Sequence, residues 1–433
     1  MSLIEKNAIV SALLHSNGAA LAAYEHMTPD AIAAGLNAGH MTLLGNPAHK
    51  NVSPTLIGQP GRVKVNANIG TSPMINNVEM EIQKLRLAEK AGAHTVMDLS
   101  TAGDLDQVRV RILEASPLPL GTVPLYSVAQ PYVARGQDPS DFSEQELFEE
   151  IEKEARQGVD FMTLHCGVTE RGASLATDGR RILGIVSRGG SLLARWMKRH
   201  RKENPLLEGY DRLLDICLEH NVTISLGDGL RPGAGADAGD AAQWEEVSVL
   251  GDLATRALAK GVQIMIEGPG HVPLHLVASQ IQGIKRLTNN APLYVLGPLT
   301  TDAAAGYDHI AGAIGGAQAA FYGADFLCYL TPAEHVTLPG PEDVWDGVKA
   351  SLIAAQSAET ALGRPWAVER DLAISRARAA LDWDAMAANA LDPHTLAKRR
   401  KDFHKEKECA MCGSFCAIRM LEGLEPENTC GSK

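Results

Sequence analysis

Short apolar segments of strand length alternate with longer segments of helical period along most of the chain. This alternation is typical of βαβ units and therefore of a parallel sheet. Residues 76–92 and 245–261 have the helical period and end in glycine, as helices commonly do. The pattern predicts an α/β fold, a (βα)8 TIM-like barrel first and a doubly wound sheet second. Nine segments fit the strand pattern, one more than a barrel needs: 63–70, 94–100, 118–127, 159–167, 182–190, 222–230, 262–271, 292–299 and 324–332.

Most of these predicted strands begin apolar and finish in polar residues or glycine. In a barrel the C-terminal strand ends form the catalytic face. Taken singly, each polar residue is explained as a helix cap or a turn residue. Repetition at nearly every strand end instead favours one shared site. The residues concerned are Asn66, Asn68, Asp98, Ser100, Tyr126, His165, Ser187, Arg188, Asp228, Arg231, Glu267 and His271.

Two of these strand ends carry groups suited to an anionic or amino ligand. Ser187 and Arg188 precede two glycines at the start of a predicted helix, where free N–H groups and a cation suit a phosphate. Asp228 and Arg231 offer an acceptor and a bidentate donor three residues apart. The alternative explanations are a structural Gly-Gly turn and an internal Asp-Arg pair.

Histidines near two strand ends suggest a metal site. Glu267 and His271 lie four apart, but the intervening Pro-Gly forbids a helix, so a tight loop must bring them together. His335 follows the last predicted strand, so the two imidazoles could meet at one catalytic metal with open positions. Possible supporting groups are Tyr307, Asp308 and His309. The glycine-rich segment 311–323 lacks a preceding strand and G-x-G-x-x-G spacing, which predicts close helix packing and no dinucleotide site.

Composition narrows the possible partners. The chain has 433 residues and a net charge of -12, with no long Lys/Arg run, so a nucleic-acid partner gains little support. No apolar run approaches the length of a membrane span. Of seven cysteines, Cys166, Cys217 and Cys328 lie in apolar patterns typical of free thiols in a reducing compartment. We expect a cytoplasmic protein.

Three further cysteines form a C-x2-C-x3-C motif at Cys409, Cys412 and Cys416. Structural zinc would need a fourth ligand, for which His404 and Cys430 are candidates. An iron-sulphur cubane on three cysteines instead leaves one iron open, as radical chemistry with S-adenosylmethionine requires. The charged segment 394–408 before the motif predicts a tether or an exposed helix. Both types of centre fit the spacing.

Ten motifs in order closely resemble the phosphomethylpyrimidine synthase family, from about residue 60 to 420. They are "VKVNANIGTSP", "HTVMDLSTAGD", "GTVPLY", "GIVSRGGS", "SLGDGLRPG", "IMIEGPGHVPL", "YVLGPLTTD", "GYDHI", "TPAEH" and "CAMCGSFCAIR". The resemblance implies a radical S-adenosylmethionine lyase that consumes aminoimidazole ribotide. It also implies a (βα)8 barrel and a homodimer in which the cluster segment serves the partner's active site. The predicted segments are 1–60 (N-terminal), 61–340 (barrel), 341–400 (C-terminal helices) and 401–433 (cluster-binding tail).

The resemblance also assigns residues. It makes Cys409, Cys412 and Cys416 ligands of a [4Fe-4S] cluster, which with S-adenosylmethionine yields a 5'-deoxyadenosyl radical. His271 and His335 match the ligands of a divalent metal, with zinc as the first candidate. Such a cluster needs an electron donor such as a flavodoxin or ferredoxin. The substrate contacts fall on Asn68, Met97, Tyr126, His165, Ser187, Arg188, Gly189, Asp228, Gly229, Leu230, Arg231, Glu267 and Tyr294.

Two branches of the family share this substrate, and the chain departs from the pyrimidine-synthase pattern. "PIYQA" reads "PLYSVA" (124–129), "DIAPGYDH" reads "DAAAGYDH" (302–309) and "EHLGLP" reads "EHVTLP" (334–339); the cysteine motif is one residue shorter than C-x2-C-x4-C. These changes favour the branch that makes 5-hydroxybenzimidazole for the lower ligand of anaerobic cobamides. The alternative is hydroxymethylpyrimidine phosphate for thiamine, and a remote one is a non-catalytic barrel that binds zinc or a ribotide.

Overall fold

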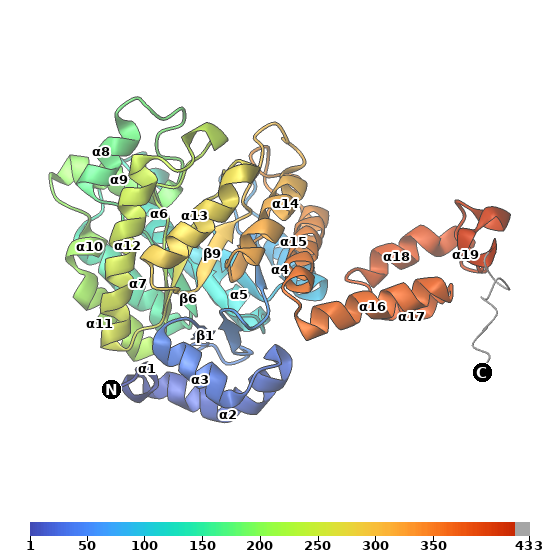
Figure 1. Cartoon of the computed structure of the whole chain (residues 1–433). Helices are drawn as coiled ribbons and strands as arrows, with labels where there is room; N and C mark the ends of the chain where they lie inside the picture. Colours follow the sequence, from blue (N-terminus) through green and yellow to red (C-terminus); the bar gives the residue numbers. More distant parts are fainter. Residues whose placement is uncertain (421–433) are drawn as a thin grey trace. The chain divides into compact units, whose positions relative to one another are not determined.

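The computed structural model describes residues 1–420 and divides the chain into two compact units, Met1–Ala361 and Leu362–Lys433. The first unit is built on a closed barrel of parallel strands, in the order β10-β3-β4-β5-β6-β7-β8-β9 (Figure 1). The barrel closes where β10 pairs with β3, with Leu327 opposite Val65. This confirms the predicted (βα)8 barrel. The strands are β3 (Lys64–Ile69), β4 (Thr95–Asp98), β5 (Leu120–Thr122), β6 (Phe161–Leu164), β7 (Thr223–Leu226), β8 (Ile264–Gly268), β9 (Leu293–Leu296) and β10 (Phe326–Cys328).

Helices surround the barrel, and both helices predicted from periodicity are present. α4 ends at Gly92 and α12 at Gly261, each in the left-handed conformation that glycine adopts without strain. Within residues 1–420, no helix is long and apolar enough to cross a membrane. The helices of this unit after β3 are α4 (Val78–Ala91), α5 (Leu105–Ala115), α6 (Pro124–Ala134), α7 (Glu144–Gln157), α8 (Glu170–Thr177), α9 (Arg188–His200), α10 (Pro205–Glu208), α11 (Tyr210–His220), α12 (Ala241–Lys260), α13 (Leu274–Leu287), α14 (Asp308–Phe321) and α15 (Pro341–Ala361), with the 3-10 turn η1 (Gly235–Asp237).

The predicted strand at 182–190 is wrong, which resolves the surplus of strand candidates. This segment is a loop that runs into α9, and Ile182 and Leu183 are mostly exposed. Their main-chain N–H groups donate to the carboxylate of Asp237, so no neighbouring strand satisfies them. Gly184 adopts a positive φ of 57°, which interrupts extended backbone. The apolar composition of this surface loop resembles that of a buried strand, which is why the sequence pattern predicted a strand there.

The N-terminal segment covers the end of the barrel where the strands begin. It consists of α1 (Leu3–Lys6), α2 (Ala8–Glu25), α3 (Pro29–Ala38) and the antiparallel pair β1 (Thr42–Leu44) and β2 (Thr55–Ile57). The N–H of Leu43 donates to Gln263 just before β8, and the N–H of Gln59 donates to Asp325 just before β10. This cover leaves the C-terminal ends of the strands as the open face.

The glycine-rich segment forms α14, as predicted for close helix packing. A Cβ atom on Gly312 would come within 2.5 Å of the Leu330 side chain, and one on Gly315 would collide with the carbonyl oxygen of Pro298. Only glycine permits such an approach of helix to backbone.

The second unit is mostly exposed. Its elements are α16 (Pro365–Ala379), α17 (Trp383–Asn389), α18 (Pro393–Arg400), η2 (Lys401–Phe403), η3 (Gly413–Phe415) and α19 (Ala417–Met420). No residue of α17 or α18 is buried. Of the segment 394–408, predicted to be a tether or an exposed helix, α18 covers the part up to Arg400 as an exposed helix, and η2 and irregular chain follow. Cys430, considered as a zinc ligand, lies outside the described residues.

Candidate active site

A cavity of about 100 Å³ opens at the C-terminal mouth of the barrel. The open face is where barrel enzymes hold their substrates. The structure places most of the predicted substrate contacts on the wall of this cavity: Asn68, Met97, Tyr126, His165, Ser187, Asp228, Arg231, Glu267 and Tyr294.

The other four predicted contacts lie just behind this wall. The guanidinium carbon of Arg188 is 4.8 Å from the ring centroid of Tyr126, a cation–π distance. A Cβ on Gly189 would collide with the His165 ring, while Gly229 faces Gly190 backbone to backbone. The glycines therefore let the start of α9 approach the turn after β7. Leu230 is fully buried and does not line the cavity.

Asp228, Arg231 and Glu267 form the charged part of the wall. Arg231 Nη1 donates to Asp228 Oδ1 at 3.0 Å, while Asp228 Oδ2 is buried with no hydrogen-bond partner in the described part of the chain. Glu267 Oε1 accepts from Thr163 at 2.6 Å and Ser225 at 3.1 Å. Burial raises the pKa of both carboxyls, because desolvation penalises the ionised form. The wall thus offers acceptors that gain from a ligand bringing N–H or O–H donors.

His165 and Ser187 form a neutral polar pair. Burial lowers the pKa of His165 to about 3, so its ring is uncharged at neutral pH. Ser187 Oγ accepts from the N–H of Gly190 as the N-cap of α9, and lies 3.1 Å from His165 Nε2. The direction of this hydrogen bond follows the tautomer of His165: the hydroxyl donates when Nε2 is bare and accepts when Nε2 carries the proton. The buried Nδ1 has no partner among the described residues, so it is available to a ligand.

Sequence reasoning missed several groups on the wall, above all Cys328 and Thr163. Cys328 Sγ accepts from Asn68 Nδ2 at 3.1 Å, and burial raises the pKa of its thiol to about 11. A buried Cys resembles any small apolar residue, so only the fold places it here. Thr163 could have been found, because it lies two positions before His165 and therefore on the same side of the strand.

Two buried ionisable residues, Arg181 and Glu246, hold the main chain of Leu230 from both sides. Its carbonyl accepts from Arg181 Nη2 at 2.7 Å, and its N–H donates to Glu246 Oε2 at 2.7 Å. Arg181 also forms a bidentate pair with Asp240, the N-cap of α12. Through these contacts α12 fixes the turn that carries Asp228. Neither Arg181 nor Glu246 was predicted, because both act through tertiary contacts.

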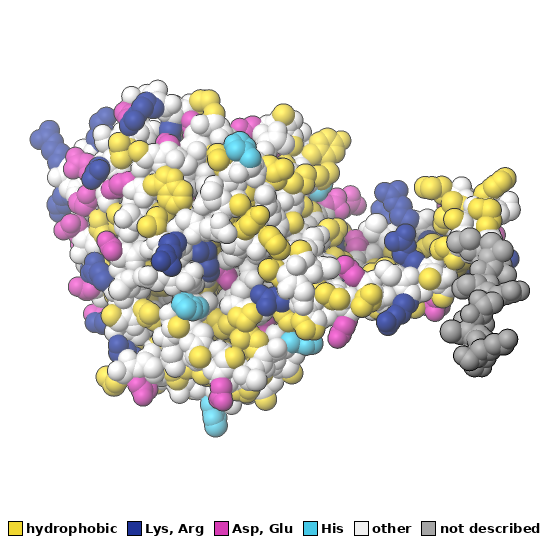
Figure 2. All heavy atoms as spheres, in the orientation of Figure 1, with side chains coloured by type: hydrophobic (Ala, Val, Ile, Leu, Met, Phe, Trp, Pro, Cys, Tyr) yellow, Lys and Arg dark blue, Asp and Glu magenta, His cyan; other side chains and the backbone are white. Residues whose placement is uncertain are grey.

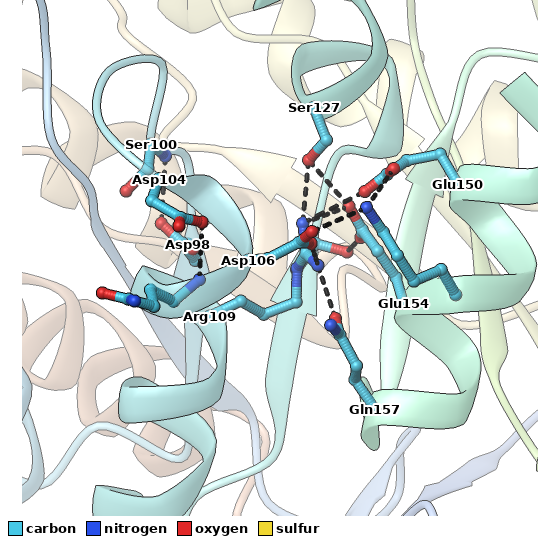
Figure 3. A network of polar contacts seen from close by, with 12 residues as sticks. Asp98, Ser100, Asp104, Asp106, Arg109, Ser127, Glu150, Glu154 and Gln157 are labelled. Carbon is cyan, nitrogen blue, oxygen red and sulfur yellow. Dashed lines mark hydrogen bonds and ion pairs between the residues drawn. The ribbon is translucent and has the colours of Figure 1, made fainter. Parts of the chain in front are cut away.

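A second network lies behind Tyr126 and centres on Arg109, which is 2% exposed (Figure 3). Its guanidinium pairs with Glu154 at 2.8 Å and donates to Ser127 at 2.9 Å. Burial raises the pKa of Glu154 to about 7. Ser127 is part of the departing motif beside Tyr126, so this sequence difference is linked to a buried network. The other partners of Arg109 are Asp106, Glu150 and Gln157.

His271 and His335 meet at the mouth, with ring centroids 5.2 Å apart. His271 Nδ1 lies 2.7 Å from Asp302 Oδ1, and His335 Nδ1 lies 3.5 Å from Asp308 Oδ1. A carboxylate only accepts, so Nδ1 of His271 carries the proton and Nε2 has a free lone pair. Burial lowers the pKa of His271, which favours this neutral ring. His335 has a φ of 59°, a left-handed conformation that concentrates at functional sites.

A second cavity, of about 210 Å³, adjoins the first. Both are lined by Asn68 and Leu99, and the second also has Arg188, Glu334 and His335 on its wall. The mouth therefore holds two adjoining cavities that share part of their wall.

The three cysteines of the tail lie in the second unit. Cys409 and Cys412 are hydrogen-bonded to each other through their side chains, and Cys416 is buried. The main-chain N–H groups of Cys412 and Met411 lower the pKa of Cys409. Within residues 1–420, however, no group of three or more His, Cys, Asp or Glu side chains is arranged to hold a metal ion. The donor types fit a three-thiolate cluster, and His404 Nδ1 is instead bonded to the carbonyl of Lys401.

Comparison with known proteins identifies the family. Residues 8–423 match the model of the Radical SAM ThiC family. Over 93% of this chain and 93% of theirs, the chain is 49% identical to the phosphomethylpyrimidine synthase of Thermoanaerobacter sp. (strain X514). It is also 49% identical to that of Methanocaldococcus jannaschii, over 89% of this chain and 91% of the other. A dihydropteroate synthase from Yersinia pestis has a TM-score of only 0.41 at 11% identity, covering 74% of this chain and 98% of its own, a likeness too weak to inform function.

These findings also correct one expectation. The two relatives that are 49% identical to this chain are both phosphomethylpyrimidine synthases, so the expected 5-hydroxybenzimidazole product finds no support and the alternative thiamine branch fits better. The loop departures do not identify a product on their own. The chain belongs to the Radical SAM ThiC family.

Proposed function

We propose that the protein is a phosphomethylpyrimidine synthase, a lyase that converts aminoimidazole ribotide into hydroxymethylpyrimidine phosphate for thiamine. The observation that carries the proposal is the cavity at the barrel mouth, which gathers most of the residues that the family resemblance assigns to the substrate. The identity to synthases of this name over almost the whole chain supports the product.

The wall of the cavity matches the two ends of the ribotide. The phosphate suits Arg188 and the first turn of α9, where the main-chain N–H groups of Arg188 and Gly189 have no intrahelical acceptor. The aminoimidazole and the ribose hydroxyls suit the acceptors of Asp228 and Glu267. Asp228 and Arg231 are already paired, so both are oriented before the substrate arrives.

His271 and His335 would hold a divalent metal, with zinc the first candidate. Each Nδ1 faces a carboxylate, an arrangement typical of metal-ligating histidines because it directs Nε2 toward the metal. Two protein ligands leave positions open for a reactant. The second cavity, which includes His335, would receive S-adenosylmethionine.

Cys409, Cys412 and Cys416 would hold a [4Fe-4S] cluster. When bound, the cluster supplies the electron that cleaves S-adenosylmethionine. The part of the barrel is to bind the ribotide, orient it and limit water around it. Delivery of the cluster segment to the active site of a partner subunit, and a flavodoxin or ferredoxin as the electron source, belong to the same proposal.

The test is anaerobic reconstitution with iron and sulphide, followed by addition of S-adenosylmethionine, a reductant and aminoimidazole ribotide. We expect 5'-deoxyadenosine to form in proportion to the ribotide consumed. C412S is the control and should form none, while keeping the barrel folded. Uptake of zinc in place of iron, with no deoxyadenosine, would refute the proposal.

A further inference from the structure

An exposed run of basic residues stands directly before the cysteine motif. We define the basic segment as Lys398, Arg399, Lys401, Lys405 and Lys407, in the last turn of α18, in η2 and in the residues that follow. All five side chains are exposed. Among the contacts of the described chain, none of them makes a salt bridge or a side-chain hydrogen bond. Five cations within ten positions thus face solvent without an ion-pair partner in the described chain.

Arg400 lies inside the same run but serves the structure. Its guanidinium carbon stacks 3.6 Å from the ring centroid of Trp383, and it donates to the carbonyls of Phe403 and Glu406. The indole of Trp383 donates to the carbonyl of Lys407 at 2.8 Å. These contacts hold the path of residues 400–407, so the exposed cations are presented from a defined backbone next to Cys409.

The net charge of the basic segment is opposite in sign to the net charge of the whole chain. The protein has 52 acidic and 40 basic residues, yet residues 398–407 contain only two acids, Asp402 and Glu406. Figure 2 shows the dark blue Lys and Arg atoms gathered over the region of α18. A net positive charge on one short segment raises the potential there and attracts a partner of opposite sign.

We propose that the basic segment is the docking surface for a small acidic electron-carrier protein that reduces the cluster. The inference rests on the proposed function, because that reaction consumes an electron from outside the chain. Electron transfer slows steeply with distance, so the carrier must bind beside the cysteines, and this segment is the charged surface next to them in sequence. A nucleic acid is the less suitable occupant, because the acidic remainder of the chain would repel its phosphates.

The test compares two double variants with the same change of charge. K398E/K401E reverses two charges of the basic segment. K198E/K202E reverses two exposed lysines of the barrel unit, at and after the end of α9, and is the matched control. Reconstituted enzyme is mixed with photoreduced flavodoxin as the acidic probe, and cluster bleaching is followed by stopped flow at several salt concentrations.

At low salt we expect K398E/K401E to be reduced about 10-fold more slowly than wild type, since electrostatic steering changes association rates by 10-fold or more. The difference should shrink as salt rises, K398Q/K401Q should fall between, and K198E/K202E should match wild type. Dithionite should reduce all four proteins equally, which shows that the cluster is loaded.

Three results would overturn the docking proposal. One is an unchanged rate in K398E/K401E, and another is equal slowing in K198E/K202E. The third is a loss of dithionite-driven 5'-deoxyadenosine formation in K398E/K401E, which would assign the segment to a contact within the enzyme. If K398E/K401E lost DNA binding while flavodoxin still reduced its cluster at the wild-type rate, the basic segment would be assigned to nucleic-acid binding. If wild type takes up no iron and sulphide, the proposed function fails, and docking with it.

Discussion

The contact between Glu246 and Leu230 allows a sharp test of how α12 positions the substrate site. Glu246 is 2% exposed, its Oε2 accepts the N–H of Leu230 at 2.7 Å, and its Oε1 has no partner within the described chain. Burial, followed by the nearby carboxyl of Asp228, raises the pKa of Glu246 well above its usual range. This shift favours the protonated side chain, and in either protonation state a carboxyl oxygen accepts the hydrogen bond from Leu230.

Two substitutions of Glu246 separate the effect of its hydrogen-bond acceptor from the effect of its charge. E246Q keeps an acceptor oxygen of the same reach, so at pH 7 its KM for the ribotide should stay within about twofold of wild type. E246L leaves the N–H of Leu230 buried and unpaired, which costs about 1–3 kcal/mol. If that cost appears in the substrate-bound state, kcat/KM falls by about 5- to 150-fold. D252N, an exposed position on the same helix, is the control.

The pH dependence gives the second readout. A carboxyl whose pKa is raised on folding stabilises the protein less as pH rises through that pKa, because the folded state binds the proton more tightly. Wild type should therefore lose stability at high pH relative to E246Q, measured by thermal unfolding. If E246Q and E246L were equally impaired at pH 7, the explanation by the acceptor oxygen would be refuted.

Three further predictions concern other parts of the site. The pKa of Glu154 rises from 4.5 to about 7 on folding, so the free energy of unfolding of wild type should fall by about 3 kcal/mol between pH 4.5 and 7. Calorimetry should show no such fall in E154Q, while the surface variant E152Q should show the same fall as wild type. In G190A the new Cβ meets the carbonyl oxygen of Gly229, so ribotide binding by titration calorimetry should be lost, and unchanged affinity would contradict the close approach. D302N should weaken metal binding about 10- to 100-fold in chelator competition without changing cluster iron, because Asp302 orients His271.

The barrel was predictable because its strands and helices differ in hydrophobic period. The polar strand ends were equally visible, and the shared mouth follows from the rule that parallel barrel strands end on one face. The pairing of His271 with His335 followed from the same rule, across 64 positions of sequence.

Residues that hold the cavity wall in place without lining the cavity could not be predicted from the sequence. Arg181 and Glu246 are ordinary ionisable residues in the sequence, and only the fold shows that they hold the main chain of Leu230 in the turn after β7. The error at 182–190 has the same origin, because Asp237 in η1 accepts hydrogen bonds from that backbone across more than fifty positions of sequence. The hydrophobic period of a sequence indicates which face of a helix or strand is buried. It carries no information about a loop whose backbone is held by side chains from elsewhere in the chain.

The most direct test of the central claim is the identity of the product. Reconstituted enzyme would be incubated anaerobically with aminoimidazole ribotide, S-adenosylmethionine and a strong reductant, and the aromatic product identified by mass spectrometry and fluorescence. We predict a phosphorylated hydroxymethylpyrimidine. A phosphate-free benzimidazole would contradict the proposed product while leaving the barrel, the substrate cavity and the family unchanged.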